Sequence, residues 1–394
     1  MANIKKYLLL IIVAGFSFAA PKPVWAFAFA YQNSLMEVEP EAFDLWKGTG
    51  SIFKHSQLEA SANVKSALLA YLGMNVKPEA ETKIFKYRPD KIYEFVKTLS
   101  QKINVAKTEP VLEIKDGVAI NFLPPSDGLT VDVYGSTIKA LDALEKKLSQ
   151  SDLLAQIDKP TKSLMETNGL GINELIALGE SSFAGSPKNR IHNVKVGTGK
   201  FKGVIIKPGE EFSFNKFLGP VEEEQGFLPE LVIKRTGTVP ELGGGLCQVS
   251  STTFRAAMNA GLPITQRKNH AYAVQYYSPQ GTDATIYPGI VDLKFINNTP
   301  GHILIWPYIK DKYKLAFEFY GTKDSRRVTL EKPIQYDRKP DGSMKAEWTR
   351  VIQKDGQTST STFKSIYLSP ALFHKEEAFP TSTSITAVHM PKTN

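Results

Sequence analysis

Apolar and polar residues repeat with a helical period in some stretches of this chain and with the period of strands in others. Apolar residues at the 3.6-residue period predict a helix opened by Pro89-Asp90: Ile92, Phe95, Val96, Leu99 and Ile103. Residues 111–114 and 118–122 alternate around Asp116-Gly117, which predicts a hairpin. A second amphipathic helix is expected from Ser136 onward, with that serine as its cap. These elements predict a small α+β module over residues 60–162, preceded by a weakly structured lead-in at 31–60.

A different pattern covers the middle of the chain. After a connector at 163–185, residues 202–206 and 212–214 read as strands on either side of a Pro208-Gly209 turn. Residues 249–259 predict a helix, which Ser250 or Ser251 would cap and which Gly261 would end. The run that starts at His270 alternates like a strand, and Asp292 opens another.

The last part of the chain predicts mostly strands. Alternating stretches lie at 314–320, 327–330, 346–354 and 362–367, with a turn at Asp355-Gly356. Residues 311–372 are therefore expected to be either a β extension of the central domain or a small β domain. The polar, Ser/Thr/Pro-rich segment 375–394 is expected to be disordered. The fold class predicted for the whole chain is α+β.

The N-terminus has the composition of a targeting segment. Lys5 and Lys6 precede an apolar stretch at 7–20, and Val24-Trp25-Ala26 fits the small-x-small rule for cleavage. Ala26-Phe27-Ala28 and Ala28-Phe29-Ala30 fit the same rule. We therefore expect a signal peptide within residues 1–30 and export to the periplasm, the cell wall or the medium. An uncleaved signal anchor is the remaining alternative and the only membrane attachment expected.

The composition of the chain restricts the kinds of binding partner that are expected. The chain has 394 residues, 42% of them hydrophobic and 22% charged, with a net charge of +8, which suits a globular protein with real cores. A basic excess spread along the chain suits contact with an anionic envelope polymer or a membrane surface. Because the sequence has no dense Lys/Arg cluster and no nucleic-acid motif, no nucleic acid is expected as a partner.

The chain contains one cysteine, which cannot form an internal disulfide. Cys247 is therefore either a small buried side chain or a working thiol. It follows Gly243, Gly244 and Gly245 and lies at or just before the start of the predicted helix, where free amides and the helix dipole favour a thiolate.

Downstream residues could complete a nucleophilic site. His270 would take the thiol proton, and Asp283 or Asp292 would orient the imidazole. Backbone amides at the helix start, including that of Cys247, would bind the oxyanion, and Gln248 or Gln225 would add a side-chain donor. Each residue also has a structural alternative: Cys247 as a packing residue, His270 as a strand-end histidine hydrogen-bonded to backbone, and Asp283 as a turn residue.

Further residues are predicted to contact substrate. They are the three glycines of the run and five polar or aromatic side chains: Gly243, Gly244, Gly245, Gln248, Ser250, Arg190, His192 and Tyr272. His192 has a second interpretation as a stabiliser of the loop that enters the domain. No metal or cofactor is expected, because the His and Cys spacings match no metal motif and no Gly-Lys-Ser/Thr follows the glycine run.

The motifs quoted above resemble a known family. The 201–215 stretch, the Gly243-to-Gln248 run and the 270–279 stretch stand in the order typical of the VanW domain of bacterial cell-envelope proteins, over about residues 170–310. The two N-terminal helices, the 115–117 turn and the 128–132 stretch resemble the peptidoglycan-binding module that often precedes it. The order of Cys, His and acid is similar to the papain-like and transglutaminase-like core, with a shorter gap between Cys247 and His270.

Two functions follow from this resemblance. One is an exported thiol amidase or transpeptidase that acts on peptidoglycan stem peptides. The other is a non-catalytic protein that binds peptidoglycan or another envelope polymer, with Cys247 as a packing residue.

Overall fold

The computed structural model describes residues 27–52, 83–234 and 237–373. It divides into two compact units: the first comprises the described residues up to 111 together with 123–163, and the second comprises 112–122 and the described residues from 164 onward. Residues 1–26 of the signal peptide predicted at 1–30, and the predicted disordered tail 375–394, lie outside the described residues. Within these described ranges, no helix combines the length and apolar character needed to cross a membrane.

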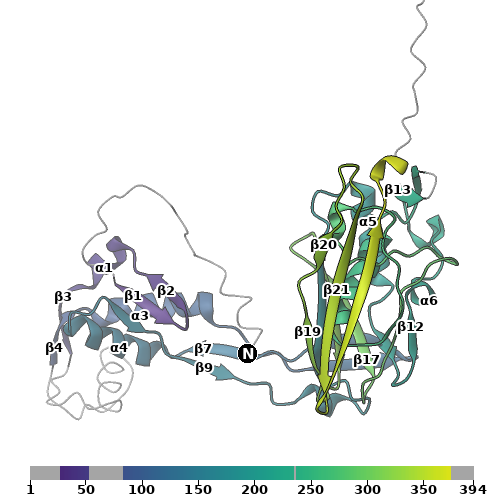
Figure 1. Cartoon of the computed structure of the whole chain (residues 1–394). Coiled ribbons are helices and arrows are strands. Elements are labelled where there is room, and N and C mark those ends of the chain that lie inside the picture. Colours follow the sequence, from purple (N-terminus) through teal and green to yellow (C-terminus); the bar gives the residue numbers. More distant parts are fainter. Residues whose placement is uncertain (1–26, 53–82, 235–236, 374–394) are drawn as a thin grey trace, which may run out of the picture. The chain divides into compact units, whose positions relative to one another are not determined.

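The first unit combines short strands and helices (Figure 1). Its elements are β1 (Ala28–Tyr31), β2 (Ser34–Glu37), α1 (Pro40–Trp46), β3 (Lys47–Ile52), β4 (Lys83–Tyr87), α3 (Pro89–Ile103), β7 (Gly128–Val131), α4 (Val133–Glu145), β8 (Gln150–Asp152) and β9 (Ala155–Asp158). The strands form the sheets β2-β1-β8, β3-β4 and β7-β9. The helix predicted from Pro89 is confirmed as α3, whose Ile92 and Val96 are fully buried.

Two local predictions in this unit are wrong. The expected lead-in at 31–60 contains β2, α1 and β3, because Phe43 and Trp46 of α1 are buried in the core of the unit. Helix α4 begins before Ser136: its cap is Asp132, whose carboxylate accepts the Gly135 amide at 2.9 Å.

The hairpin predicted around Asp116-Gly117 is confirmed. Strands β5 (Val111–Lys115) and β6 (Val118–Leu123) pair, and both turn residues have positive φ. Residues 112–122 nevertheless belong to the second unit, whereas the sequence placed them in the N-terminal module. The reason is packing: Phe122 contacts Trp306 and Tyr320 edge-on, with ring centroids 5.2 and 4.7 Å apart.

The second unit contains the remaining elements. Its helices are η2 (Leu164–Thr167), α5 (Lys188–Gly199), α6 (Phe214–Leu218), η3 (Glu223–Gln225), α7 (Leu246–Asn259), η4 (Gln275–Tyr277) and η5 (Pro370–Leu372). Its strands after the hairpin are β10 (Glu174–Ser182), β11 (Val204–Ile206), β12 (Glu211–Ser213), β13 (Pro229–Lys234), β14 (Gly237–Leu242), β15 (Ile264–Gln266), β16 (Lys294–Ile296), β17 (Ile303–Lys310), β18 (Lys314–Gly321), β19 (Arg327–Leu330), β20 (Ile334–Tyr336), β21 (Met344–Lys354) and β22 (Gln357–Tyr367). Helices and strands thus mix in both units, as the α+β prediction requires.

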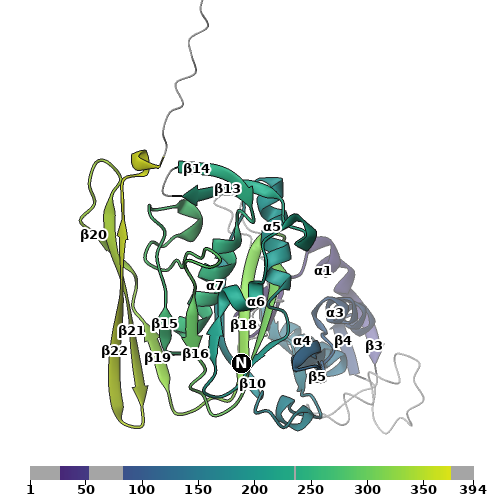
Figure 2. The same cartoon turned by 90° about the vertical axis from the view of Figure 1, so that its right-hand side faces the viewer.

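A four-stranded antiparallel sheet, ordered β10-β18-β17-β11, supports helix α7 (Figure 2). The helix lies against β10 and β18. The approach is close at Gly179, where an added Cβ would lie 2.2 Å from the carbonyl oxygen of Thr252. The expected connector at 163–185 therefore includes β10, an edge strand of this central sheet.

The C-terminal strands form a second sheet beside the same helix. The order is β19-β21-β20, with β22 also paired to β21, and Figure 2 shows how long the β21–β22 hairpin is. The four predicted strands of the tail are confirmed, with β18 in the central sheet and the others here. Trp348 and Phe363 pack edge-on against Phe254 of α7. The C-terminal sheet is thus part of the second unit.

Candidate Cys–His–Asp site

The glycine run determines where helix α7 begins. Gly245 is the residue before the first helical turn, with φ 113°, and Gly243 has φ 81°, a region of φ that side chains disfavour. The helix therefore starts at Leu246, earlier than predicted, and Ser250 and Ser251 lie inside it. Cys247 is in the first turn, where amide groups have no partner further back in the helix.

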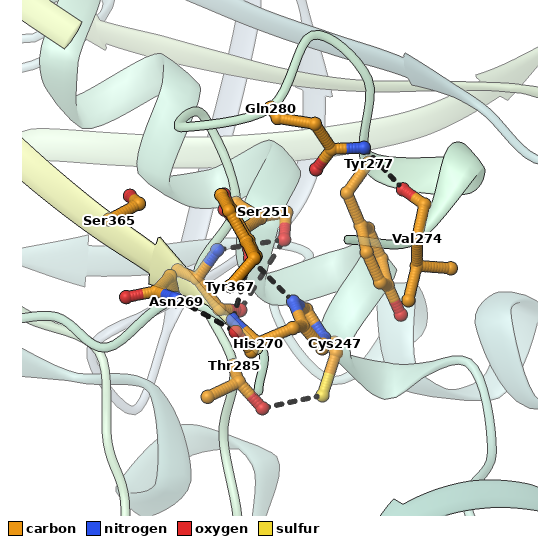
Figure 3. A network of polar contacts seen from close by, with 12 residues as sticks. Cys247, Ser251, Asn269, His270, Val274, Tyr277, Gln280, Thr285, Ser365 and Tyr367 are labelled. Carbon is orange, nitrogen blue, oxygen red and sulfur yellow. Dashed lines mark hydrogen bonds and ion pairs between the residues drawn. The ribbon is translucent and has the colours of Figure 1, made fainter. Parts of the chain in front are cut away.

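The thiol of Cys247 is half-buried beside a loop of the same unit. Its Sγ lies 3.4 Å from Thr285 Oγ1 and 3.7 Å from the carbonyl oxygen of Ile286. Figure 3 shows Thr285 on one side of the sulfur and the ring of His270 on another. Polar groups rather than aliphatic side chains alone therefore surround the sulfur.

His270 lies in a loop, and the strand predicted to start there is absent: residues 270–279 form a loop with the short helix η4. The imidazole is held on two sides. Nδ1 lies 2.6 Å from Asp283 Oδ2, and the ring stacks on Tyr277 with centroids 4.0 Å apart and planes 13° apart. With 4% of its surface exposed, the ring has one defined orientation.

The second ring nitrogen of His270, Nε2, is on the side of the ring that faces Cys247 (Figure 3). Nε2 is buried and makes no hydrogen bond to any described residue, although a buried polar atom normally finds one. The imidazole still interacts with Cys247, first through a side-chain contact and then through charge. Burial alone would raise the pKa of the Cys247 thiol, but His270 holds that pKa below its ordinary value.

The reciprocal effect acts on His270. Burial alone would lower the pKa of the imidazole, but its hydrogen bond to Asp283 and its contact with Cys247 raise that pKa from 6.5 to about 9. The two shifts together favour the ion pair of thiolate and imidazolium over the neutral pair.

Asp283 is a buried carboxylate with four donors. Oδ2 accepts both Nδ1 and the backbone amide of His270, the latter at 2.8 Å. Oδ1 accepts the hydroxyl of Tyr367 at 2.6 Å and the guanidinium of Arg267 at 3.2 Å. Burial would raise the pKa of Asp283, but His270 and Arg267 hold it well below its usual range, so the group stays ionised.

Asp292 accepts hydrogen bonds from a different set of groups than Asp283 does. Its carboxylate accepts the hydroxyl of Ser213 at 2.6 Å and the backbone amides of Asn215 and Leu293 at 2.9 and 2.8 Å. These bonds join the start of α6 to the approach to β16. Of the two acids proposed from the sequence, the structure brings Asp283 to His270 and gives Asp292 a structural role.

Gln248 and Arg190 bind each other and stabilise the segment next to the site. The amide of Gln248 donates to Ser181 Oγ at 2.8 Å and accepts the guanidinium of Arg190 at 3.0 Å. Arg190 also lies over the ring of Tyr276, 4.0 Å from its centroid. Both side chains are buried. These contacts therefore hold η4, which carries Tyr277. Because Gln248 and Arg190 are bound by other protein groups, they are not available for the substrate contacts predicted for them.

The other predicted binding residues are also engaged in the fold. Ser250 is fully buried inside α7, and a Cβ on Gly244 would lie 2.8 Å from Cβ of Glu230. His192 is in α5 rather than in a loop, and its Nε2 lies 2.8 Å from the carbonyl oxygen of Gly226. Tyr272 packs against Phe373 with ring centroids 5.3 Å apart.

Sequence reasoning missed four residues of the site: Thr285, Tyr277, Arg267 and Tyr367. Their types gave no signal, since a threonine, two tyrosines and an arginine are ordinary residues in loops and strands. Only the spatial arrangement assigns them to the cysteine, the histidine and the aspartate. In the part of the chain that the structure describes, no group of three or more His, Cys, Asp or Glu side chains is arranged to hold a metal ion.

The fold and the site define a class: an α+β domain in which a cysteine in the first turn of a helix lies beside a histidine oriented by an aspartate. Residues 189–320 match the family model described as VanW like protein. The chain therefore carries a VanW domain, as its motifs predicted.

Two curated relatives match over part of the chain. "Uncharacterized protein YoaR" of Bacillus subtilis (strain 168) is 38% identical over 123 residues, which are 31% of this chain and 40% of that protein. "Vancomycin B-type resistance protein VanW" of Enterococcus faecalis (strain ATCC 700802 / V583) is 29% identical over 162 residues, 39% of this chain and 58% of that protein. The chain thus spans about half the length of these relatives. No solved structure gives a significant match.

Proposed function

We propose that this VanW-type protein is an exported thiol-dependent acyl transferase that cleaves or exchanges an amide bond of peptidoglycan stem peptides. The observation that carries the proposal is the state of His270: its Nδ1 is fixed by Asp283, while its buried Nε2 has no partner among the described residues and lies beside Cys247. An imidazole arranged in this way is suited to move a proton between a thiol and a substrate.

The reaction would proceed in two steps. The Cys247 thiolate attacks the amide carbonyl carbon, and the backbone amide of Cys247, in the first turn of α7, stabilises the oxyanion. The imidazolium of His270 gives its Nε2 proton to the leaving amine as the carbon–nitrogen bond breaks and a thioester forms. Water then yields the acid, or a second amine yields a new amide, and either restores the thiol.

Thr285 fits this sequence of events. Its hydroxyl is 3.4 Å from Sγ and its side chain is half-buried, so it can donate to the thiolate before attack. Gln248 has no such role, because its amide already donates to Ser181. Export and wall contact are supported by the N-terminal sequence and by the net charge of +8.

The test is incubation of the full chain with purified sacculi, followed by mass analysis of released and cross-linked muropeptides. We expect wild-type protein to change the product profile and Cys247→Ala to leave it as in buffer. Thr198→Ser, a conservative change in α5 away from the thiol, serves as the matched control and is expected to behave as wild type. Identical profiles for wild type and Cys247→Ala, with equal sedimentation with sacculi, would instead favour a non-catalytic binding protein.

A further inference from the structure

Tyr367, at the end of β22, contacts the site from the C-terminal sheet. Its hydroxyl donates to Asp283 Oδ1 at 2.6 Å and accepts the backbone amide of Gly281 at 2.7 Å. The side chain is 1% exposed. Two hydrogen bonds in a buried setting therefore fix both the hydroxyl and the direction in which it donates.

The same end of β22 is bonded to the loop that carries His270. The amide of Leu368 donates to the carbonyl of Ala271 at 2.8 Å. The side-chain amide of Asn269 donates to the carbonyl of Ile366 at 2.7 Å. Figure 3 shows Ser365, Tyr367 and Asn269 around His270. The loop with the imidazole is thus anchored on the C-terminal sheet.

Arg267 adds a second bridge between the two parts. Its guanidinium donates to Ser365 Oγ at 2.9 Å and also to Asp283 Oδ1. The sheet therefore reaches Asp283 directly through Tyr367 and indirectly through Arg267. All of these sheet residues lie after residue 320, where the family match ends.

We infer that Tyr367 is a positioning residue: it holds the Asp283 carboxylate turned toward His270, so that the C-terminal sheet is part of the thiol site. The inference rests on the proposed thiolate–imidazolium function. Loss of the Tyr367 hydroxyl would leave a buried carboxylate with one donor fewer. Without that donor the carboxylate is no longer fixed in its orientation toward Nδ1, so Asp283 supports the imidazolium less, and the thiolate in turn.

The experiment is the rate of iodoacetamide alkylation as a function of pH, measured on the full chain. Because Cys247 is the only cysteine, the rate reports on that thiol alone. For Tyr367→Phe we expect the midpoint of the profile to rise by about 0.4 to 1 pH unit, the equivalent of one ordinary hydrogen bond. Tyr336→Phe is the matched control: Tyr336 is an exposed tyrosine of the same sheet that donates to Glu347, and its midpoint should equal that of wild type.

The outcomes separate this inference from the function on which it rests. If the wild-type midpoint is that of an ordinary thiol and His270→Gln does not change it, the thiolate proposal fails. If the wild-type midpoint is low and His270→Gln raises it, but Tyr367→Phe leaves it unchanged, the function stands and the role of Tyr367 is refuted.

A second variant covers the case in which Tyr367→Phe does not fold. Incorporation of 3-fluorotyrosine at position 367 alone keeps the hydroxyl and its two contacts and makes the phenol a stronger donor to Asp283. Because a stronger donor draws the charge of Asp283 away from His270, we expect a higher alkylation midpoint than in wild type. An equal midpoint would show that the hydroxyl does not influence the thiol and would overturn the inference.

Discussion

Asp283 and Asp292 are both buried and both bound by several donors, but only one of them faces a group that can change charge. Asp283 accepts Nδ1 of His270, whereas Asp292 accepts a serine hydroxyl and backbone amides. The consequence of mutation should therefore differ in kind. Loss of charge at Asp283 affects the imidazolium, and loss of charge at Asp292 affects the fold.

Asp283→Asn should reduce product formation by about 100-fold or more, because an amide favours the wrong tautomer of the histidine. Asp292→Asn should lower the free energy of unfolding by about 1–3 kcal/mol, because donors around it lose an acceptor. The first change is measured as muropeptide release, and the second by urea denaturation. A reversed pattern, with Asp292→Asn inactive but fully stable, would contradict the assignment of the two acids.

The protonation of His270 sets the upper pH limit of the reaction. Its pKa is raised from 6.5 to about 9, so the ring is protonated below about 9 and loses its proton as pH rises through that value. The leaving amine then lacks a proton donor, and the rate should fall. A pH–rate profile on sacculi checks this, and a rate that keeps rising above pH 9 would argue against His270 as the acid.

At the scale of elements, the site depends on how closely α7 approaches β10. Gly179 permits this contact, since an added Cβ would meet the backbone of Thr252 at 2.2 Å and of Ala256 at 2.5 Å. The hydroxyls of Ser181 and Thr252 also bond across the same contact at 2.7 Å. Any shift of α7 away from the sheet moves Cys247 relative to His270.

Gly179→Ala should therefore destabilise the second unit by about 1–3 kcal/mol through overpacking. It should also slow alkylation of Cys247 near neutral pH. Gly199→Ala is the matched control, because nothing lies within 4 Å of its added Cβ. Thermal unfolding and the alkylation rate provide the two measurements. Equal behaviour of the two variants would mean that the helix contact tolerates the extra carbon.

At the scale of the whole molecule, the burial of Phe27 and Phe29 restricts where a signal peptide could be removed. Phe27 and Phe29 are 1% and 0% exposed, and the carbonyl of Phe27 accepts the amide of Val38 at 2.8 Å. Cleavage after Ala28 or Ala30 would remove one or both rings from the core of the first unit.

We therefore expect the exported mature chain to begin at Phe27, after the Val24-Trp25-Ala26 site. Loss of a buried phenylalanine costs about 3–5 kcal/mol, which a small unit tolerates poorly. Edman sequencing or intact mass of the exported protein decides the point. A mature chain that begins at Phe29 or Tyr31 and remains folded would contradict it.

Local patterns were sufficient for much of this protein. The sequence predicted the α+β class, helix α3, the β5–β6 hairpin and the strands of the tail, because apolar periodicity and turn residues act over a few neighbours. The sequence also indicated Cys247, His270 and Asp283 as candidates by residue type, and the motifs around them identified the VanW domain.

Only the tertiary structure decided between the acids and completed the site. The strand predicted at His270 is absent because Asp283, Tyr277 and the end of β22 hold that segment in a loop. Arg267 and Tyr367 meet Asp283 across a large distance in sequence, and no local pattern records such a contact. Residue types along the chain thus determine which chemistry is available, whereas long-range packing determines which side chains share one charge network.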